Sequence, residues 1–147
     1  NDSKKLSEKK RELLFPVIQE NALAFGIGFA DEKEIDEINI LQATFLAMRR
    51  AFDAMQRRCD YVLVDGNRMP PMPETVVKGD AKSPSIAAAS ILAKVSRDRV
   101  MLEYAKQYPE YQFEKHKGYG TKAHVEALRA FGPSPIHRRT FLKKILG

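Results

Sequence analysis

Residues 61–84, "YVLVDGNRMPPMPETVVKGDAKSP", decide the fold of this chain. A short β-branched run ends in Asp65, a proline-rich connector follows, and a second strand-like run ends in Asp80. Both runs are too short for helices and are bounded by turn residues, so we expect two β-strands. Ser83 and Pro84 then supply a capping side chain and a proline at the first helical position, which predicts the start of a helix.

The amino-terminal side of this stretch predicts a helix, a strand and a second helix. Ser7 can cap a short first helix that Pro16 kinks or ends early. Residues 22–30 read as a strand, in which two glycines allow close approach of another backbone or a ligand. Asp31 and Glu34 resemble a capping box at the start of the clearest helix. The expected apolar side of the first helix is Leu13, Leu14, Val17 and Ile18, and the core stripe of the second is Ile35, Ile38, Leu41, Phe45, Met48, Phe52 and Met55.

The carboxyl-terminal side predicts two helices separated by a basic loop. The helix that begins at Pro84 is long and ends before Pro109. The loop "FEKHKGYGTK" follows, and a last helix is expected from about Thr121 to Phe131, before a glycine and a proline. Because strands and helices alternate along the chain, the fold class is α/β, a sheet packed by helices.

Composition indicates one soluble globular domain. The 147 residues are 44% hydrophobic and 30% charged, which is enough to bury a core. No apolar run approaches the length of a membrane span, and the opening "NDSKKLSEKK" does not resemble a secretion signal. A single cysteine, Cys59, excludes an internal disulfide framework and a cysteine-built metal site. We therefore expect an intracellular protein without membrane contact.

The charge balance makes polyanions plausible partners. Lys and Arg number 25 against 19 Asp and Glu, a net charge of +6. The basic residues are clustered at residues 4–11, 78–82, 114–122 and 137–144, whereas residues 31–37 are acidic. This clustering suggests an oriented electrostatic face, and the alternative is ordinary solvated helix surface.

The two aspartates are the first candidates for chemistry. Each follows a strand at the edge of an α/β sheet where ligand sites usually form. If the two strands lie close together, the carboxylates repel unless a cation lies between them, which implies a divalent metal. Lys78 and Lys82 flank Asp80, and the helix start after Ser83 would attract phosphate. The alternative is that Asp65 and Asp80 make turns, the lysines are surface charges and Ser83 is only a cap.

The basic loop contains two further candidates. The three histidines of the chain lack the spacing of a zinc site, and His116 could contact phosphate or be a partly exposed structural residue. Tyr119 lies between two glycines and could stack on a sugar or base, or pack the loop down onto the fold.

Several long motifs carry a resemblance to a known family. They are "NDSKKLSEKKRE", "EIDEINILQATFLAMRRA", "YVLVDGNRMP", "VVKGDAKSPSIAAASILAKVSRDR" and "HKGYGTKAH", in this order. Together they resemble bacterial ribonuclease HII over nearly the whole chain. The resemblance implies a ribonuclease H-like mixed sheet flanked by helices, in a single domain over residues 1–147 whose residues from about 110 form a substrate-binding helical part. It also implies an endonuclease that cuts RNA in RNA/DNA hybrids and at single ribonucleotides embedded in duplex DNA, leaving 3′-hydroxyl and 5′-phosphate ends.

The resemblance also implies roles for individual residues. Asp65 and Asp80 match the third and fourth active-site carboxylates, which ligand or position Mg²⁺ or Mn²⁺ for two-metal hydrolysis. Tyr119 matches a tyrosine that packs on the deoxyribose after the ribonucleotide. The further residues expected near the substrate are Ser3, Lys4, Lys5, Lys78, Lys82, His116 and Lys117.

One family motif is not found in these residues. The "DEAGRG" segment of the family supplies the first two carboxylates and a backbone that senses the ribose 2′-hydroxyl, and Asp31 with Glu32 cannot substitute for it because they head a helix. We therefore expect a carboxyl-terminal portion that lacks the first strands of the sheet and is inactive alone. Truncation, an omitted disordered part or a second chain that carries the segment would each explain this. The complete enzyme is expected to be a cytoplasmic monomer.

Two other classes of function compete with this interpretation. A non-catalytic nucleic-acid-binding module would use the basic loops and would bind without divalent metal, with affinity falling steeply in salt. A phosphate-ester hydrolase for small molecules is disfavoured by the extended basic segments.

Overall fold

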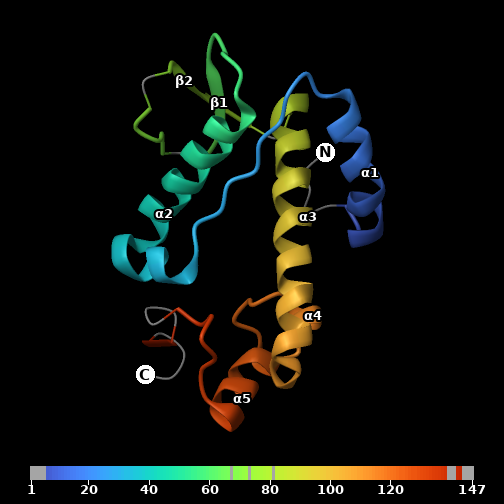
Figure 1. The fold of residues 1–147 in the computed structure, drawn as a ribbon, viewed down its shortest axis with the longest axis vertical. Coiled ribbons are helices and arrows are strands. Elements are labelled where there is room, and N and C mark those ends of the chain that lie inside the picture. The colour runs from blue at the N-terminus through green and yellow to red at the C-terminus, as the bar shows by residue number, and fades with distance from the viewer. Residues whose placement is uncertain (1–5, 67, 73, 81, 139–141, 144–147) are drawn as a thin grey trace. The chain divides into compact units, whose positions relative to one another are not determined.

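The computed structural model describes residues 6–66, 68–72, 74–80, 82–138 and 142–143. Its elements are α1 (Glu8–Asn21), α2 (Glu32–Met55), β1 (Val62–Asp65), β2 (Val76–Gly79), α3 (Pro84–Gln107), the 3₁₀ helix η2 (Pro109–Tyr111), α4 (Phe113–His116) and α5 (Lys122–Phe131) (Figure 1). The chain forms two compact units: the first unit is Asn1–Ala30 with Thr44–Ser96, and the second unit is Asp31–Ala43 with Arg97–Gly147.

A two-stranded parallel sheet lies in the first unit. β1 and β2 pair from Val62 with Val76 to Asp65 with Gly79. This confirms both predicted strands, and a small sheet among helices is consistent with the predicted ribonuclease H-like α/β class. None of the described residues of the connector 66–75 is helical, although parallel strands usually need a crossover of a dozen or more residues.

The core of the first unit lies between α1 and the first half of α3. Phe15 packs with Ile91, Leu92 and Val95, all nearly inaccessible to solvent. Ser7 caps α1 as predicted, its Oγ accepting from Lys10 N at 3.2 Å.

The predicted apolar side of α1 is wrong. Arg11 and Phe15 are its buried residues, whereas Leu13 is 65% exposed and Val17 also lies at the surface. Only Ile18 of the expected four packs against this core. The reason is that Phe15, the largest apolar side chain of α1, turns its own face toward α3. Pro16 lies inside the helix and does not end it, so of the two expected effects the early end is wrong and the kink stays a prediction.

Residues 22–30 form an extended segment and not the predicted strand, because they pair with no strand among the described residues. The predicted close approach at the two glycines is confirmed. A Cβ at Gly26 would lie 2.7 Å from Met55 N, and one at Gly28 would lie 2.9 Å from Arg50 C, with other α2 backbone atoms closer still. These glycines therefore let the segment lie directly on the α2 backbone.

α2 begins as predicted but is interrupted. Asp31 N donates to Glu34 Oε1 at 3.1 Å and Glu34 N donates to Asp31 Oδ1 at 2.9 Å, which is the capping box. Asn39 has φ 73° and ψ 167°, so the predicted single helix is two helical stretches. The Asn39 side chain caps the second stretch by accepting from Gln42 N at 3.0 Å.

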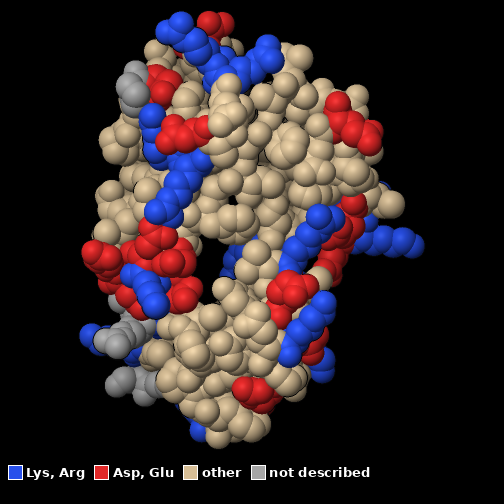
Figure 2. Space-filling model, viewed as in Figure 1, with Lys and Arg blue, Asp and Glu red and all other residues tan. Residues whose placement is uncertain are grey.

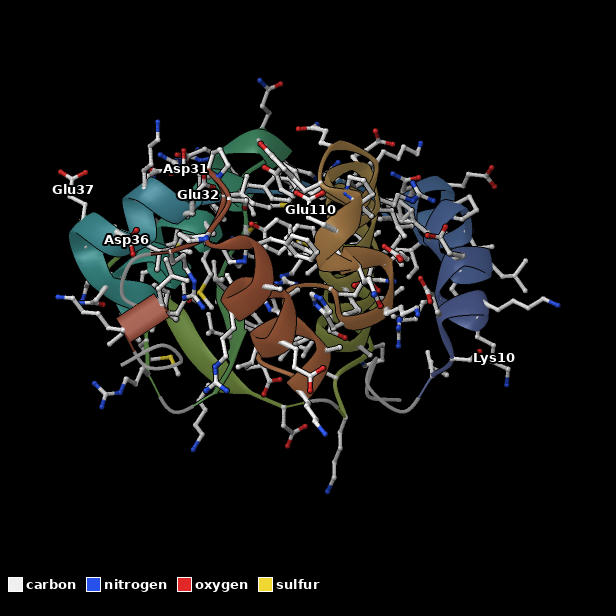
Figure 3. The ribbon with its side chains drawn as sticks, turned by 90° about the horizontal axis from the view of Figure 1, so that it is seen from below. Lys10, Asp31, Glu32, Asp36, Glu37 and Glu110 are labelled. Atoms are coloured by element: carbon white, nitrogen blue, oxygen red, sulfur yellow. The ribbon has the colours of Figure 1, made fainter. Side chains whose placement is uncertain are left out.

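The predicted core stripe of α2 is only half-buried, and Ala43 is the buried residue of this helix. Figure 3 labels four acidic residues near the start of this helix, Asp31, Glu32, Asp36 and Glu37, of which Asp31 and Glu37 are exposed. Acidic side chains near a helix N-terminus favour the helix through its dipole.

The second unit has its own core under η2, α4 and α5. Its buried residues are Met101, Tyr111, Phe113, Ala127 and Leu128. The expected basic loop is therefore partly helical, since η2 and α4 fall within or beside it. α5 matches its prediction, with Thr121 Oγ1 accepting from His124 N at 3.3 Å and Gly132 ending the helix at φ 73°. The expected part from about residue 110 lies inside the second unit, and the single-domain organisation stays a prediction.

None of the helices in the described part of the chain is long and apolar enough to cross a membrane.

We predict that Gly28→Ala lowers the free energy of unfolding by about 1–3 kcal/mol, because the new methyl group overlaps the α2 backbone and one of the two must move. Urea unfolding followed by circular dichroism measures the change. Leu23→Ala is the matched control, since Leu23 is 86% exposed in the same segment and should change stability by less than about 0.5 kcal/mol. Equal effects of the two variants would contradict the packing role of Gly28.

Candidate functional site

The two aspartates come to the same edge of the sheet. Asp65 is the last residue of β1 and lies opposite Gly79, and Asp80 follows Gly79 directly. Since β1 and β2 are parallel, both carboxylates leave the sheet at its carboxyl edge. Both residues are exposed.

Asp80 also makes a turn, which was the structural alternative for this residue. Its Oδ1 accepts from Lys82 N at 2.9 Å, and its carbonyl oxygen accepts from Ser83 N at 3.1 Å. This turn leads into α3, where Ser83 Oγ accepts weakly from Ile86 N at 3.5 Å. A turn role and a role in ligand binding are compatible, because a carboxylate has two acceptor oxygens.

The start of α3 packs against the end of β2. A Cβ at Gly79 would collide with Ile86 Cδ1 and would lie 3.5 Å from Leu63 Cβ, so the Ile86 side chain fills the space that a larger residue at position 79 would take. The amino end of a 24-residue helix thus lies beside the two aspartates. Its partial positive charge favours an anion there. Lys78 and Lys82 are exposed on either side of Asp80.

The donor chemistry of this edge fits a hard divalent cation but does not complete its coordination. Mg²⁺ prefers oxygen ligands and near-octahedral geometry, which two carboxylates supply only in part. Within the described ranges, no three His, Cys, Asp or Glu side chains are grouped so that they could bind a metal. Asp65 and Asp80 would therefore be part of a metal site and not the whole of it.

A second group of predicted residues lies in the second unit, on the loop of residues 117–121. Tyr119 is 56% exposed, so its ring is not packed into the fold. Arg97 Cζ lies 5.1 Å from the centroid of this ring, and Arg97 Nη1 donates to Lys117 O at 2.7 Å. Gly118 has φ 87°, and a Cβ there would lie 3.1 Å from Met101 Cε. α3 therefore supports the loop from one side while the tyrosine stays accessible.

Sequence reasoning missed Arg97. It lies 22 positions before Tyr119, on a helix whose charges are read as solvated surface, and no local spacing connects the two. The only signal was its place in "KVSRDR", one of the stretches that carry the family resemblance.

The three histidines form a cluster that the sequence did not predict. His116 and His124 are buried, with exposed fractions of 6% and 1%, and their rings stack with centroids 4.3 Å apart. His124 Nε2 lies 2.8 Å from His137 Nε2. The expectation that His116 is partly exposed is wrong, because Phe113 and His124 pack on its ring. A contact of His116 with substrate stays a prediction.

Burial lowers the pKa of two of these rings. It is the largest cause for His137, whose pKa falls from 6.5 to about 4, with the neighbouring His124 and His116 adding to the shift. Burial also lowers the pKa of His124, against a hydrogen bond to the Tyr119 backbone that raises it. Both rings are therefore neutral at pH 7.

The remaining predicted residues are at the surface or outside the described part of the chain. Lys117 Nζ donates to Glu114 O at 2.8 Å, and Ser3, Lys4 and Lys5 lie outside the described residues. Figure 2 shows basic and acidic side chains interspersed on the face in view. Whether the clusters of Lys and Arg along the sequence form an oriented electrostatic face stays a prediction.

Comparison with known proteins decides the family. A family model described as ribonuclease HII matches residues 1–144. The chain belongs to the ribonuclease HII family. It is 59% identical over 149 aligned residues to the ribonuclease HII of Caldanaerobacter subterraneus subsp. tengcongensis, covering 99% of this chain and 62% of that protein. It is 63% identical over 145 residues to the ribonuclease HII of Endomicrobium trichonymphae, covering 96% of this chain and 69% of the relative.

A third relative shows the same relation of lengths. The ribonuclease HII of Clostridioides difficile is 56% identical over 149 residues, which cover 99% of this chain and 58% of that protein. The chain therefore spans between 58% and 69% of the length of these three ribonuclease HII relatives.

We predict that acid destabilises the second unit through its histidines. A histidine whose pKa is lower in the folded state binds its proton more tightly in the unfolded chain, so stability present above pH 6.5 is lost as the pH falls from 6.5 toward about 4. Because His137 is only half-buried, the effect is discounted to about 1 kcal/mol, or about 2–6 °C in Tm, between pH 7.5 and pH 5. Thermal unfolding at the two pH values measures it. His137→Phe should reduce the difference, and an unchanged difference would show that other groups cause it.

Proposed function

We propose that this chain supplies part of the active site of a metal-dependent endonuclease that cuts RNA in RNA/DNA hybrids and at single ribonucleotides embedded in duplex DNA. The observation that carries the proposal is the parallel register of β1 and β2, which brings Asp65 and Asp80 to one edge beside the start of α3. Membership of the ribonuclease HII family supports it. We also propose that the two strands belong to a larger mixed sheet of the ribonuclease H-like type.

Asp65 and Asp80 would bind Mg²⁺ or Mn²⁺ together with further ligands. The bound ions would supply Lewis-acid activation of water and charge stabilisation at the leaving 3′-oxygen, giving a 3′-hydroxyl and a 5′-phosphate. The chain's own contribution is to fix two carboxylates on a strand end and on a turn, and to place the positive end of α3 near the scissile phosphate. Lys78 and Lys82 would contact neighbouring phosphates.

Tyr119 would read the junction between the ribonucleotide and the following deoxyribose. Its exposed ring offers an apolar face to a sugar, and Arg97 covers that ring while its guanidinium is tied to the loop backbone. An aromatic face discriminates by shape and not by hydrogen bonds, which suits a sugar that lacks a 2′-hydroxyl.

We predict that Mn²⁺ binds at the carboxyl edge of the sheet. In NMR spectra of the chain, Mn²⁺ should broaden the amide signals of Gly66 and Lys82 at a metal concentration that leaves α5 unchanged. Asp65→Asn should weaken this binding by about tenfold or more, because it removes one charged oxygen ligand. Asp60→Asn is the matched control, since Asp60 is exposed just before β1, at the opposite end of the strand. Equal broadening in the Asp65→Asn variant would remove the proposed metal role.

Cleavage by the chain alone is a separate question. Two of the four carboxylates that the family resemblance implies are present in these 147 residues, so we expect the chain with Mg²⁺ to leave a duplex with one embedded ribonucleotide uncut. Rapid cutting that Asp65→Asn abolishes would contradict this expectation and show that two carboxylates suffice.

We predict that Tyr119→Ala weakens binding of a duplex with one ribonucleotide by about 1–3 kcal/mol, the value of one aromatic stacking contact, and changes binding of all-DNA duplex much less. Fluorescence anisotropy with labelled duplexes measures both affinities. Tyr61→Ala is the matched control, because Tyr61 is 57% exposed and Tyr119 is 56% exposed. If both variants weaken the binding of both duplexes equally, Tyr119 does not read the junction.

One observation favours a second candidate, a non-catalytic nucleic-acid-binding module. Asp80 Oδ1 is used in a turn, and no group of three metal ligands occurs in the described ranges. Such a module would bind duplexes equally well with and without Mg²⁺, and its affinity would depend on salt alone. The Mn²⁺ experiment with Asp65→Asn separates the two candidates.

A further inference from the structure

The histidine cluster, His116, His124 and His137, lies directly under the loop that carries Tyr119. His124 Nδ1 lies 2.8 Å from Tyr119 O, and Gly118 N donates to His116 Nδ1 at 3.1 Å. These two contacts fix the backbone on both sides of Tyr119 N, which itself donates to His116 O at 3.0 Å. The cluster thus bonds to the peptide groups next to the exposed ring and not to the ring itself.

The hydrogen-bond partners of the three neutral histidine rings are compatible with only one set of tautomers. A carbonyl oxygen only accepts, so His124 carries its proton on Nδ1, facing Tyr119 O, and His116 carries its proton on Nε2, 2.5 Å from Tyr111 O. A backbone N–H only donates, so His137 Nδ1, which receives Ser134 N–H at 2.9 Å, is unprotonated. Neutral His137 then carries its proton on Nε2 and donates it to His124 Nε2.

All six ring nitrogens therefore have a partner, and each ring fixes the next. Ser134 N–H donates to His137 Nδ1, which leaves the proton of His137 on Nε2. His137 Nε2–H donates to the lone pair of His124 Nε2, so His124 carries its own proton on Nδ1 and donates it to Tyr119 O. An additional proton on any ring would face an N–H donor. Such a network is stable when complete, and it fails when one member is lost.

We propose that the histidine cluster is a positioning clamp for Tyr119, in which the relay from Ser134 through His137 and His124 fixes the 117–121 loop in one conformation. This proposal rests on the proposed function only in its last step, that Tyr119 contacts substrate. The three histidines are positioning residues: they contact the loop backbone, and none of them is assigned a step in cleavage.

The surroundings of the cluster favour this role over metal binding. The rings of His116 and His124 are stacked with an interplanar angle of 10°, so their nitrogens do not converge on one point. The side chains that pack on the rings are aromatic, Phe113 on all three and Tyr111 on His137. Among the charged or titratable groups, Lys115 and Lys117 flank His116 in the sequence, Arg138 follows His137, Tyr111 packs on His137, and Arg97 Nη1 donates to Lys117 O.

A core built for packing alone would not need these contacts. Imidazoles are poor replacements for Leu or Phe inside a core, because each buried nitrogen must be paired. Here the ring nitrogens of His116 and His124 are paired with the backbone of the loop that carries Tyr119. The family resemblance places this exposed tyrosine on the substrate. A side chain that selects its ligand by shape binds more tightly when its position is already fixed, because less conformational entropy is lost on binding.

The first experiment measures the protons directly in the 147-residue chain. Nitrogen-15 spectra of the histidine rings at pH 7.5 should show protons on His116 Nε2, His124 Nδ1 and His137 Nε2. Any other set of tautomers would overturn the proposal. This measurement needs no variant and no substrate, so it is independent of whether the chain cuts or binds nucleic acid.

The second experiment removes one donor and keeps the packing. His137→Phe retains an aromatic ring beside Tyr111 and leaves His124 Nε2 without its donor. The amide of Thr121, which donates to Tyr119 O at 2.8 Å, should then exchange with solvent about three to ten times faster, the loss expected for one hydrogen bond. His137→Gln should restore slow exchange, because its amide N–H can donate to His124.

Phe113→Leu is the control for packing, since Phe113 is buried against all three rings but donates no hydrogen bond from its side chain. It should speed exchange evenly along α5, including the amide of Gly132, which donates to Leu128 O. If His137→Phe gives that same even increase, or if His137→Gln fails to restore the loop, the clamp is wrong.

The third experiment connects the clamp to substrate. His137→Phe should weaken the preference for a duplex with one ribonucleotide over all-DNA duplex by about threefold, and Tyr119→Ala should remove the preference. If only Tyr119→Ala has an effect, the clamp is wrong while the proposed function stands. If neither changes the preference, the proposed function of Tyr119 fails, and the tautomers and the amide exchange still decide whether the cluster fixes the loop.

Discussion

The parallel pairing of β1 with β2 fixes the positions of the two candidate metal ligands in the first unit, Asp65 and Asp80. A parallel pair sends both carboxyl ends to one edge, so Asp65 and Asp80 meet there although fifteen positions separate them in the sequence. At Gly79 the Ile86 side chain of α3 packs in the space that a larger side chain would occupy, next to Leu63 of β1. An antiparallel pair would have placed the two carboxylates at opposite ends of the sheet.

In the second unit, the exposed ring of Tyr119 belongs to a loop whose backbone is hydrogen-bonded to neighbouring elements. Arg97 supports the loop from α3, and the buried histidines bond to the loop backbone from below. Burying three imidazoles is costly unless every nitrogen is paired, and that is the condition the observed contacts meet. The same condition disfavours an additional proton on any of these rings, because a protonated ring has one donor more than the observed partners can accept.

Local signals in the sequence predicted where helices and strands begin and end better than they predicted which elements pack or pair with one another. The caps at Ser7 and Asp31, the start of the last helix near Thr121 and both strands were predicted, since each depends on a few adjacent residues. The break at Asn39 was not, because the apolar spacing continues through it and only the backbone turns. Residues 22–30 have the composition of a strand, but a strand also needs a partner, which composition does not reveal.

For the candidate site, too, single positions could be predicted from the sequence, whereas contacts between elements could not. The positions of Asp65 and Asp80 followed from strand ends, and their shared edge depended on a parallel register that no local pattern gives. Arg97 and the histidine cluster were missed because the contacts that assemble them join different elements: Arg97 with Lys117 over 20 positions, His124 with His137 over 13, and His116 with His124 over 8. Spacing arguments cover one helix or one strand and do not reach such pairs.

The ten-residue connector between β1 and β2 has a consequence for the order of folding. Paired positions such as Val62 and Val76 are only fourteen residues apart, so the entropy lost in closing this loop is small for a parallel pair. Pro70 and Pro71 reduce it further by restricting the unfolded connector, and an ion pair at 3.1 Å joins Arg49 of α2 to Glu74 near its end. Contacts of short range form early in folding. We therefore expect the edge that carries the two aspartates to be among the first parts of the first unit to reach its native arrangement, before the extended segment docks its glycines on α2.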